Sequence, residues 1–240
     1  AEKVEGGYIL NGTKCFITNA PIADKITLFA NTREGGGIRG LTVFLVDADT
    51  KGISIGKEED KMGIRASATA EIIFEDCFVP DSARVGKEGR GFMIAMQTLQ
   101  MSRPVVAAIS VGIAQAAIEA AVAYSHHRKQ FGVKIATFEM VQQMIADMVM
   151  KTEAARILTY KACVAQMNKD KKAGLYSAMS KCFASDTAME VTTTAVQVMG
   201  GNGYSRENPV EKYMRDAKIM QIYEGTNQVQ RLVIANEATF

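Results

Sequence analysis

The sequence lacks several features that would place it in a functional class at once. Its 240 residues include two histidines, adjacent at positions 126 and 127, and four cysteines that form no C-x-x-C pair. A metal site built from His and Cys needs several such ligands at set spacings, so no metal-ligand constellation is predicted. The scattered cysteines also argue against a secreted disulfide scaffold. They favour reduced thiols in a bacterial cytoplasm or, in a eukaryote, in the mitochondrial matrix.

The sequence also lacks a large excess of charge of either sign, and it lacks long apolar runs. Lys and Arg number 28 against 26 Asp and Glu, and no basic run gathers on one element, so a nucleic-acid partner is not expected. No run reaches the roughly 18 apolar residues of a membrane span, so no membrane-spanning segment is expected. The chain opens Ala-Glu-Lys-Val, without Met or an apolar leader. We therefore expect no signal peptide, and we expect the chain to be part of a longer polypeptide.

Two patterns of periodicity divide the chain. Up to about residue 86, short runs rich in β-branched and aromatic residues alternate with turn signals and predict strands; Asn11-Gly12 predicts a hairpin turn. From residue 92 a period of 3.6 predicts long helices with short polar turns, which pack as a bundle. We place the domain boundary between residues 88 and 89. The expected helices cover 92–124, 137–167, 172–199, 210–218 and 227–237.

The first of these helices carries a proline and a stripe of small residues. Pro104 must either kink the helix or stand in its first turn. One stripe of the helix is suited to close helix packing; its members are Ile109, Gly112, Ile113, Ala116 and Ala120.

The stretch Tyr223-Glu224-Gly225-Thr226-Asn227-Gln228 is the most informative motif. A carboxylate flanked by apolar side chains is partly desolvated and becomes a usable proton acceptor near neutral pH. Gly225 allows a ligand or another backbone to approach closely. Spacing alone equally allows a helix N-terminus, capped by Thr226 or Asn227, at which Glu224 complements the helix dipole.

Three other segments combine residue types that bind cofactors. Arg128 to Gly132 could pair a phosphate with the arginine and stack a planar group on Phe131, although a helix end capped by Gly132 has the same pattern. Gln197 to Tyr204 contains three glycines whose N–H groups could bind a phosphate, or could simply stop a helix. Phe16 and Thr18 share one face of an expected strand.

Together these segments resemble one family in chain order. The matching pieces are Asn-Gly-x-Lys-x-Phe-Ile-Thr-Asn from residue 11, Lys-Met-Gly-Ile-Arg from 61, Arg-x-x-Phe-Gly from 128, Gln-x-x-Gly-Gly-x-Gly-Tyr from 197, Arg-Asp-Ala-Lys from 215 and the Glu224 stretch. The sequence closely resembles the flavin-dependent acyl-CoA dehydrogenases, above all the short- and medium-chain, butyryl-CoA type. The resemblance implies an α+β fold, in which a β-barrel or sandwich middle domain (1–88), begun part-way, precedes an up-down four-helix bundle (89–240).

The resemblance also implies roles for individual residues. Glu224 corresponds to the catalytic base, which removes the α-proton of an acyl-CoA thioester while hydride passes from the β-carbon to FAD. Positions that correspond to FAD contacts are Phe16, Thr18, Arg128, Phe131, Gln197, Gly200, Gly201, Thr226 and Gln228. Positions that correspond to substrate contacts are Tyr223, Gly225 and Arg103. The family often has Trp where this chain has Phe16, and Asp where it has Gln100.

The implied protein is a homotetrameric oxidoreductase of fatty acid metabolism, a dimer of dimers that passes electrons to an electron-transferring flavoprotein. Two alternatives stay open at this point. An enoyl-CoA reductase would use the same Glu224 and flavin in the reverse direction, because of microscopic reversibility. A fragment without the preceding helical domain would serve only as an oligomerisation module.

Overall fold

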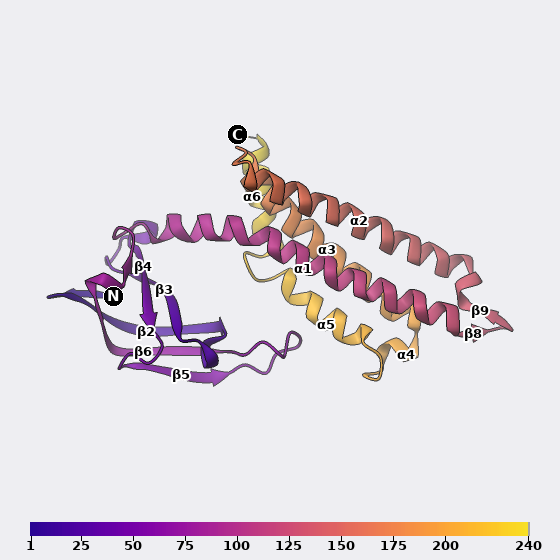
Figure 1. Ribbon diagram of the computed structural model, residues 1–240, viewed down its shortest axis with the longest axis horizontal. Helices are drawn as coiled ribbons and strands as arrows, with labels where there is room; N and C mark the ends of the chain where they lie inside the picture. Colours follow the sequence, from indigo (N-terminus) through magenta and orange to yellow (C-terminus); the bar gives the residue numbers. More distant parts are fainter. Residues whose placement is uncertain (240) are drawn as a thin grey trace. The chain divides into compact units, whose positions relative to one another are not determined.

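The computed structural model describes residues 1–239 and divides into two compact units (Figure 1). Residues 1–61 and 65–98 form the β unit, and residues 62–64 together with those from 99 onward form the helical unit. The expected α+β class is confirmed, because strands fill the first unit and helices the second.

Antiparallel strands build the β unit. One sheet has the order β1-β2-β6-β5 and a second the order β3-β4-β7. The strands are β1 (Glu2–Val4), β2 (Gly7–Thr18), β3 (Lys25–Asn31), β4 (Leu41–Asp47), β5 (Ile53–Glu58), β6 (Thr69–Pro80) and β7 (Arg84–Val85). Both sheets contribute to one core, in which Tyr8, Leu28, Phe44 and Ile72 are all at most 4% exposed. Alternate residues of β6 face this core, as period-2 patterning requires, whereas in β2 the buried positions, among them Tyr8 and Leu10, lie only at the start of the strand.

Strand β2 contains two irregularities that correct the sequence interpretation. Its pairing with β6 shifts between Leu10 and Gly12 and again between Lys14 and Ile17. Asn11-Gly12 is therefore a bulge inside a long strand rather than a hairpin turn, and Asn11 exchanges two hydrogen bonds with Asp76 of β6. At the second shift Phe16 has φ 55°, so the regular alternation assumed for Phe16 and Thr18 does not hold there.

Three long helices and three shorter ones form the helical unit (Figure 1). They are α1 (Gly91–His127), α2 (Glu139–Met167), α3 (Ala173–Met199), α4 (Gly201–Tyr204), α5 (Val210–Met220) and α6 (Asn227–Thr239). Side chains of four helices share the main core, among them Ala117 of α1, Met148 of α2, Val191 of α3 and Ala217 of α5. All five predicted helices begin and end within three residues of their expected bounds, and α4 was not expected.

Helix α1 bears on three further expectations. It is long and apolar enough to cross a membrane by length and composition, contrary to the sequence estimate. Core helices pass the same test, and Ala107, Val111 and Ala114 of α1 are indeed buried among other helices. The predicted stripe packs only in part: Ile109 is 44% exposed, whereas Ile113 and Ala120 pack against the main core. Pro104 lies inside α1, beyond its first turn.

A short hairpin follows α1. Strands β8 (Lys129–Gln130) and β9 (Val133–Lys134) pair across Phe131 and Gly132, whose φ angles of 52° and 83° are both positive. Two-residue hairpins of this type require positive φ at both central positions. Gly132 is thus a turn glycine, and its interpretation as the cap of α1 is wrong.

Residues Met62 to Ile64 are clasped by α5. The guanidinium of Arg215 donates to the Met62 carbonyl at 2.7 Å, and the Ile64 N–H donates to the Asp216 carboxylate at 2.7 Å. A Cβ on Gly63 would lie 2.4 Å from the Arg215 carbonyl oxygen, so only glycine fits between the two segments. This clasp links the Lys-Met-Gly-Ile-Arg and Arg-Asp-Ala-Lys motifs.

Candidate active site

The loop between α5 and α6 carries Glu224 in an unusual backbone conformation. Glu224 has φ 58° and Gly225 has φ 88°, so two consecutive residues are left-handed. A residue with a Cβ adopts this region at a cost of roughly 1–2 kcal/mol, which surrounding contacts must offset. The loop therefore depends on the helices beneath it.

The Glu224 carboxylate meets a hydroxyl from α1. Ser102 Oγ donates a hydrogen bond to Glu224 Oε2 at 2.5 Å. The side chain of Glu224 is neither buried nor fully exposed, so the carboxylate is held in place yet stays reachable. A carboxylate oriented by one donor with a free second oxygen is arranged to accept a proton.

Two buried side chains bind the loop backbone. Arg103 Nε donates to the Glu224 carbonyl at 3.4 Å, and Gln230 Nε2 donates to the Glu224 and Gly225 carbonyls at 3.3 and 3.1 Å. Arg103 is 8% exposed and Gln230 is 0% exposed. Burial lowers the pKa of the Arg103 guanidinium, and the charge of Glu224 opposes that shift. A Cβ on Gly225 would lie 2.5 Å from Gln230 Nε2, so this glycine is also needed for the fold of the loop.

Tyr223 lies half-buried beside Glu224. Its hydroxyl donates to the Met220 sulfur at 2.8 Å, and burial, followed by the charge of Glu224, raises the pKa of the phenol. The expected substrate roles of Tyr223, Gly225 and Arg103 stay predictions. For Arg103, the intrachain partner is the backbone of the Glu224 loop.

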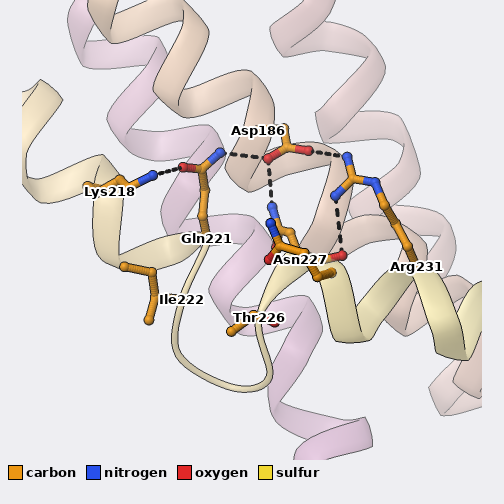
Figure 2. A pocket seen from close by; sticks show the side chains of 8 residues that line it. Asp186, Lys218, Gln221, Ile222, Thr226, Asn227 and Arg231 are labelled. Carbon is orange, nitrogen blue, oxygen red and sulfur yellow. Dashed lines mark hydrogen bonds and ion pairs between the residues drawn. The ribbon is translucent and has the colours of Figure 1, made fainter.

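A cavity of about 460 Å³ opens beside the start of α6. Thr226 and Gln228 line it, as do Asp186 of α3 and Arg231 of α6 (Figure 2). Thr226 Oγ1 accepts the Val229 N–H at 3.3 Å and so caps α6, which confirms the capping interpretation for this residue. A helix N-terminus favours anionic groups, because its N–H groups and its dipole point at them.

Asp186 is the hub of this cavity. Figure 2 shows its carboxylate receiving hydrogen bonds from Gln221, Asn227 and Arg231, at 2.6 to 2.7 Å. Burial alone raises the pKa of Asp186, but these donors outweigh it, so the pKa of the carboxyl lies below its ordinary value. Asp186 is therefore ionised and fixes the floor of the cavity.

A second cavity, of about 450 Å³, joins two of the predicted motifs. Arg128, from the end of α1, lines it together with Gly200 and Gly201, from the break between α3 and α4. Gly200 has φ 58° and ψ −136°, a conformation essentially restricted to glycine, and a Cβ on Gly201 would meet open space. The expected end of α3 at Met199 is confirmed. The Arg128 side chain and the glycine backbone of the break therefore line the same cavity.

Four other predicted cofactor residues lie outside these cavities. Gln197 stands one turn before the break and accepts the Gly200 N–H, and Phe131 is 93% exposed at the tip of the hairpin. Phe16 and Thr18 are exposed in the β unit, with Phe16 at 72%. Their contacts to a cofactor stay predictions.

The matches to known sequence families cover almost the whole chain. The model described as "Acyl-CoA dehydrogenase, C-terminal domain" matches residues 89–239, and that described as "Acyl-CoA dehydrogenase, middle domain" matches residues 1–77. The chain belongs to the acyl-CoA dehydrogenase family.

Among relatives in this acyl-CoA dehydrogenase family, the short-chain specific acyl-CoA dehydrogenase of Clostridium acetobutylicum is 48% identical over 234 residues, or 96% of this chain. The structure of butyryl-CoA dehydrogenase from Megasphaera elsdenii is 48% identical with a TM-score of 0.97, covering 100% of this chain and 62% of that one. A chain from a structural study of the electron transferring flavoprotein of Acidaminococcus fermentans is 51% identical with a TM-score of 0.96, covering 99% of this chain and 62% of that one. The chain spans 60% of the length of the curated Clostridium relative.

Sequence reasoning missed several residues of this acyl-CoA dehydrogenase site. They are the residues that hold the Glu224 loop and its neighbouring cavity from other helices: Ser102, Lys181, Asp186, Asn227 and Gln230. Ser102 precedes Arg103, but nothing in its spacing points to Glu224, which lies 122 residues away. The sequence indicates for Asn227 only a helix-capping role. In the structure Asn227 is 2% exposed, and its side chain donates a hydrogen bond to Asp186 of α3.

Proposed function

We propose that this chain provides the base and FAD-binding surfaces of an enzyme that oxidises an acyl-CoA thioester to a trans-2-enoyl-CoA. The observation that carries the proposal is the Glu224 carboxylate, held by Ser102 on a loop of two left-handed residues. In this reaction Glu224 takes the α-proton and a hydride leaves the β-carbon. When bound, FAD accepts that hydride at N5 and is reduced by two electrons.

The residues of this chain fit the proton transfer. Ser102 occupies Oε2 of Glu224, and we assign the α-proton to Oε1. Because the α-proton of a thioester is weakly acidic, its removal needs a polarised carbonyl. The family resemblance gives that task to the backbone N–H of Glu224, an oxyanion-hole arrangement.

The residues present also fit FAD. The capped start of α6 and the glycine break beside Arg128 offer N–H groups and a cation, which suit a pyrophosphate. Asp186 lines the first cavity and Met199 the second, and the rise of α3 between them corresponds to about 20 Å at roughly 1.5 Å per residue. This separation supports the expectation that the second cavity holds the FAD of a neighbouring subunit in a homotetramer.

The proposal extends to the electron acceptor and the compartment. We infer that an electron-transferring flavoprotein takes the electrons, and the similarity to a chain studied with such a flavoprotein supports this. Cys15, Cys77, Cys163 and Cys182 are all free thiols, which supports a bacterial cytoplasm or a mitochondrial matrix.

The test measures flavin bleaching in the full-length, FAD-loaded protein after butyryl-CoA is added. Glu224→Gln keeps the size of the side chain but removes the base, so the bleaching rate is expected to fall by about 10²- to 10⁴-fold. Glu119→Gln, at an exposed position of α1, is the matched control and should bleach like the wild type. If Glu224→Gln bleached as fast as the wild type, the assignment of the base would be wrong.

A further inference from the structure

A lysine lies in the interior of the helical unit. Lys181, in the middle of α3, is 0% exposed and is among the largest fully buried side chains of the chain. An ammonium group removed from water is strongly destabilising unless it is paired and hydrogen-bonded. Lys181 has no role in the proton transfer described above, so its burial needs another explanation.

The two hydrogen bonds of Lys181 both end at the Glu224 loop. Its Nζ donates to the Gly225 carbonyl at 2.8 Å and to Asn227 Oδ1 at 2.8 Å. Both acceptors are neutral oxygens. The ammonium group therefore binds a backbone carbonyl and a side-chain amide and forms no salt bridge through these two bonds. Charge-assisted bonds of this kind are stronger than neutral ones.

The acceptor Asn227 is itself held firmly. Its Oδ1 also accepts Ser185 Oγ at 3.1 Å, while its Nδ2 donates to Asp186 at 2.7 Å (Figure 2). Asn227 thereby fixes the position of the Lys181 ammonium group, which donates its other hydrogen bond to the Gly225 carbonyl.

That second bond is the shortest of the contacts to the left-handed backbone. The bonds from Arg103 and Gln230 to the same two carbonyls span 3.1 to 3.4 Å. With the Gly225 carbonyl fixed, the peptide that follows Gly225 cannot rotate freely, and together with the bonds to the Glu224 carbonyl this holds the backbone from which the Glu224 side chain projects. A displacement of about 1 Å at a reacting group can cost about 100-fold in rate.

We propose that Lys181 is a positioning residue for Glu224: its buried ammonium group fixes the Gly225 carbonyl and so holds the left-handed backbone from which the base projects. This inference rests on the proposed function, because it concerns the same base. Lys181 touches neither the carboxylate nor the substrate, and it acts through the peptide backbone.

The experiment compares the full-length, FAD-loaded wild type with Lys181→Met, which keeps the length of the side chain and removes its donors. With butyryl-CoA we expect kcat to fall 10- to 100-fold and KM to change less than about 3-fold. The kinetic isotope effect with α-deuterated butyryl-CoA should rise, because removal of the α-proton becomes more rate-limiting. In the absence of substrate, amide exchange at residues 224–226 should be faster than in the wild type.

Three further variants separate positioning from simple loss of stability. Met148→Ala opens a cavity in the bundle core and should lower stability while leaving the isotope effect unchanged. Lys181→Ala should regain activity when propylammonium is added, and Met148→Ala should not. Lys181→Gln, a neutral donor, provides a second measurement if Lys181→Met does not fold, and its kcat should lie between those of wild type and Lys181→Met.

Three results would overturn the inference. If kcat of the Lys181 variants fell only in proportion to the folded, FAD-loaded fraction, with an unchanged isotope effect, Lys181 would be a structural residue alone. If Glu224→Gln retained wild-type turnover, both this inference and the proposed function would fall. A dead Glu224→Gln beside a fully active Lys181→Met would overturn the inference alone.

Discussion

Two loops of this protein share one backbone geometry and differ in what supports it. Phe131-Gly132 and Glu224-Gly225 each place a residue with a Cβ and then a glycine in the left-handed region, at φ 52° and 83° and at φ 58° and 88°. The first pair is the exposed tip of a hairpin, held by its own two strands. The second pair is held from beneath by side chains of α1, α3 and α6.

The comparison shows that the same left-handed backbone can be stabilised either by local strand pairing or by side chains of other helices. In the hairpin the local backbone pairing is sufficient, and neighbouring helices contribute little. In the Glu224 loop the same conformation depends on three buried donors: Arg103 and Lys181 come from distant parts of the sequence, and Gln230 comes from the helix that follows the loop. The sensitivity of the two loops to substitution should therefore differ in a measurable way.

Matched glycine variants give the largest expected contrast. Gly225→Ala adds a Cβ at positive φ and forces it to within 2.5 Å of the buried Gln230 Nε2, so we expect a loss of about 3 kcal/mol in the free energy of unfolding. Gly132→Ala has the same φ penalty but meets no atom within 4 Å, so about 1 kcal/mol is expected. Urea unfolding of both variants measures the two values. Equal losses would mean that the buried donors do not constrain the Glu224 loop.

The pH dependence of stability should report on the buried donor. The pKa of Lys181 is lowered to about 8 by burial above all and by the charge of Arg103, against the opposing effects of Cys182, Asp186 and Glu224. Below pH 8 both the folded and the unfolded chain carry the proton, and the burial penalty is fully present. Between pH 8 and the ordinary value of 10.5 the unfolded chain binds more protons, so stability rises with pH.

Relative to Lys181→Met, the wild type should therefore gain of order 2 kcal/mol in the free energy of unfolding from pH 7.5 to pH 10.5. The measurement is urea unfolding of both proteins across this range. A constant difference between them would show that Lys181 keeps an ordinary pKa. Lys129→Met in the hairpin, where the side chain is exposed, should show no such pH dependence.

Ser102→Ala probes the side-chain end of the same loop. Loss of the hydroxyl removes the bond to Glu224 Oε2, and we expect kcat with butyryl-CoA to fall about 10-fold, or about 1.4 kcal/mol in the activation free energy. Stability should change by less than about 1 kcal/mol, because Ser102 is only partly buried. Stopped-flow bleaching of the flavin gives the first value and thermal unfolding the second. An unchanged rate would show that the backbone alone orients Glu224.

The smallest effect is expected at the tip of the hairpin. Phe131 is 93% exposed, so Phe131→Ala should change the free energy of unfolding by less than about 0.5 kcal/mol. If Phe131 stacks on a neighbouring subunit's FAD as the family resemblance implies, the same variant should lose flavin during gel filtration. A large loss of stability without loss of flavin would contradict both expectations.

The sequence predicted the helices better than the strands. Periodicity over 27 or more residues in α2 and α3 leaves little ambiguity about the type and ends of a helix. Strands β1 and β7 span three and two residues, which are too few for an alternation of apolar and polar residues to be recognised in the sequence. Asn11-Gly12 was misassigned, since the same dipeptide serves a hairpin turn and a bulge.

For the site, the sequence supplied Glu224 and the ligand-type residues but not their support. From the sequence, only the family resemblance suggested that Arg128 and Gly200 lie near one another. In the structure both residues line the same cavity. Ser102, Lys181 and Gln230 have no local signature, because a serine, a lysine and a glutamine are ordinary helix residues. Their roles arise from the way α1, α3 and α6 meet under one loop, which no single stretch of sequence contains.

The clasp of Met62 to Ile64 on α5 sets a limit on how the chain can be cut. A polypeptide that starts at residue 89 contains the six helices but lacks the Ile64 N–H that binds Asp216. The Asp216 side chain is only 9% exposed and would keep Lys212 as its remaining partner. The gap left by Gly63 would open onto the Arg215 backbone. Two hydrogen bonds to α5 thus come from residues that lie 152 and 153 positions before their partners in the chain, and a bundle that starts at residue 89 would lack both.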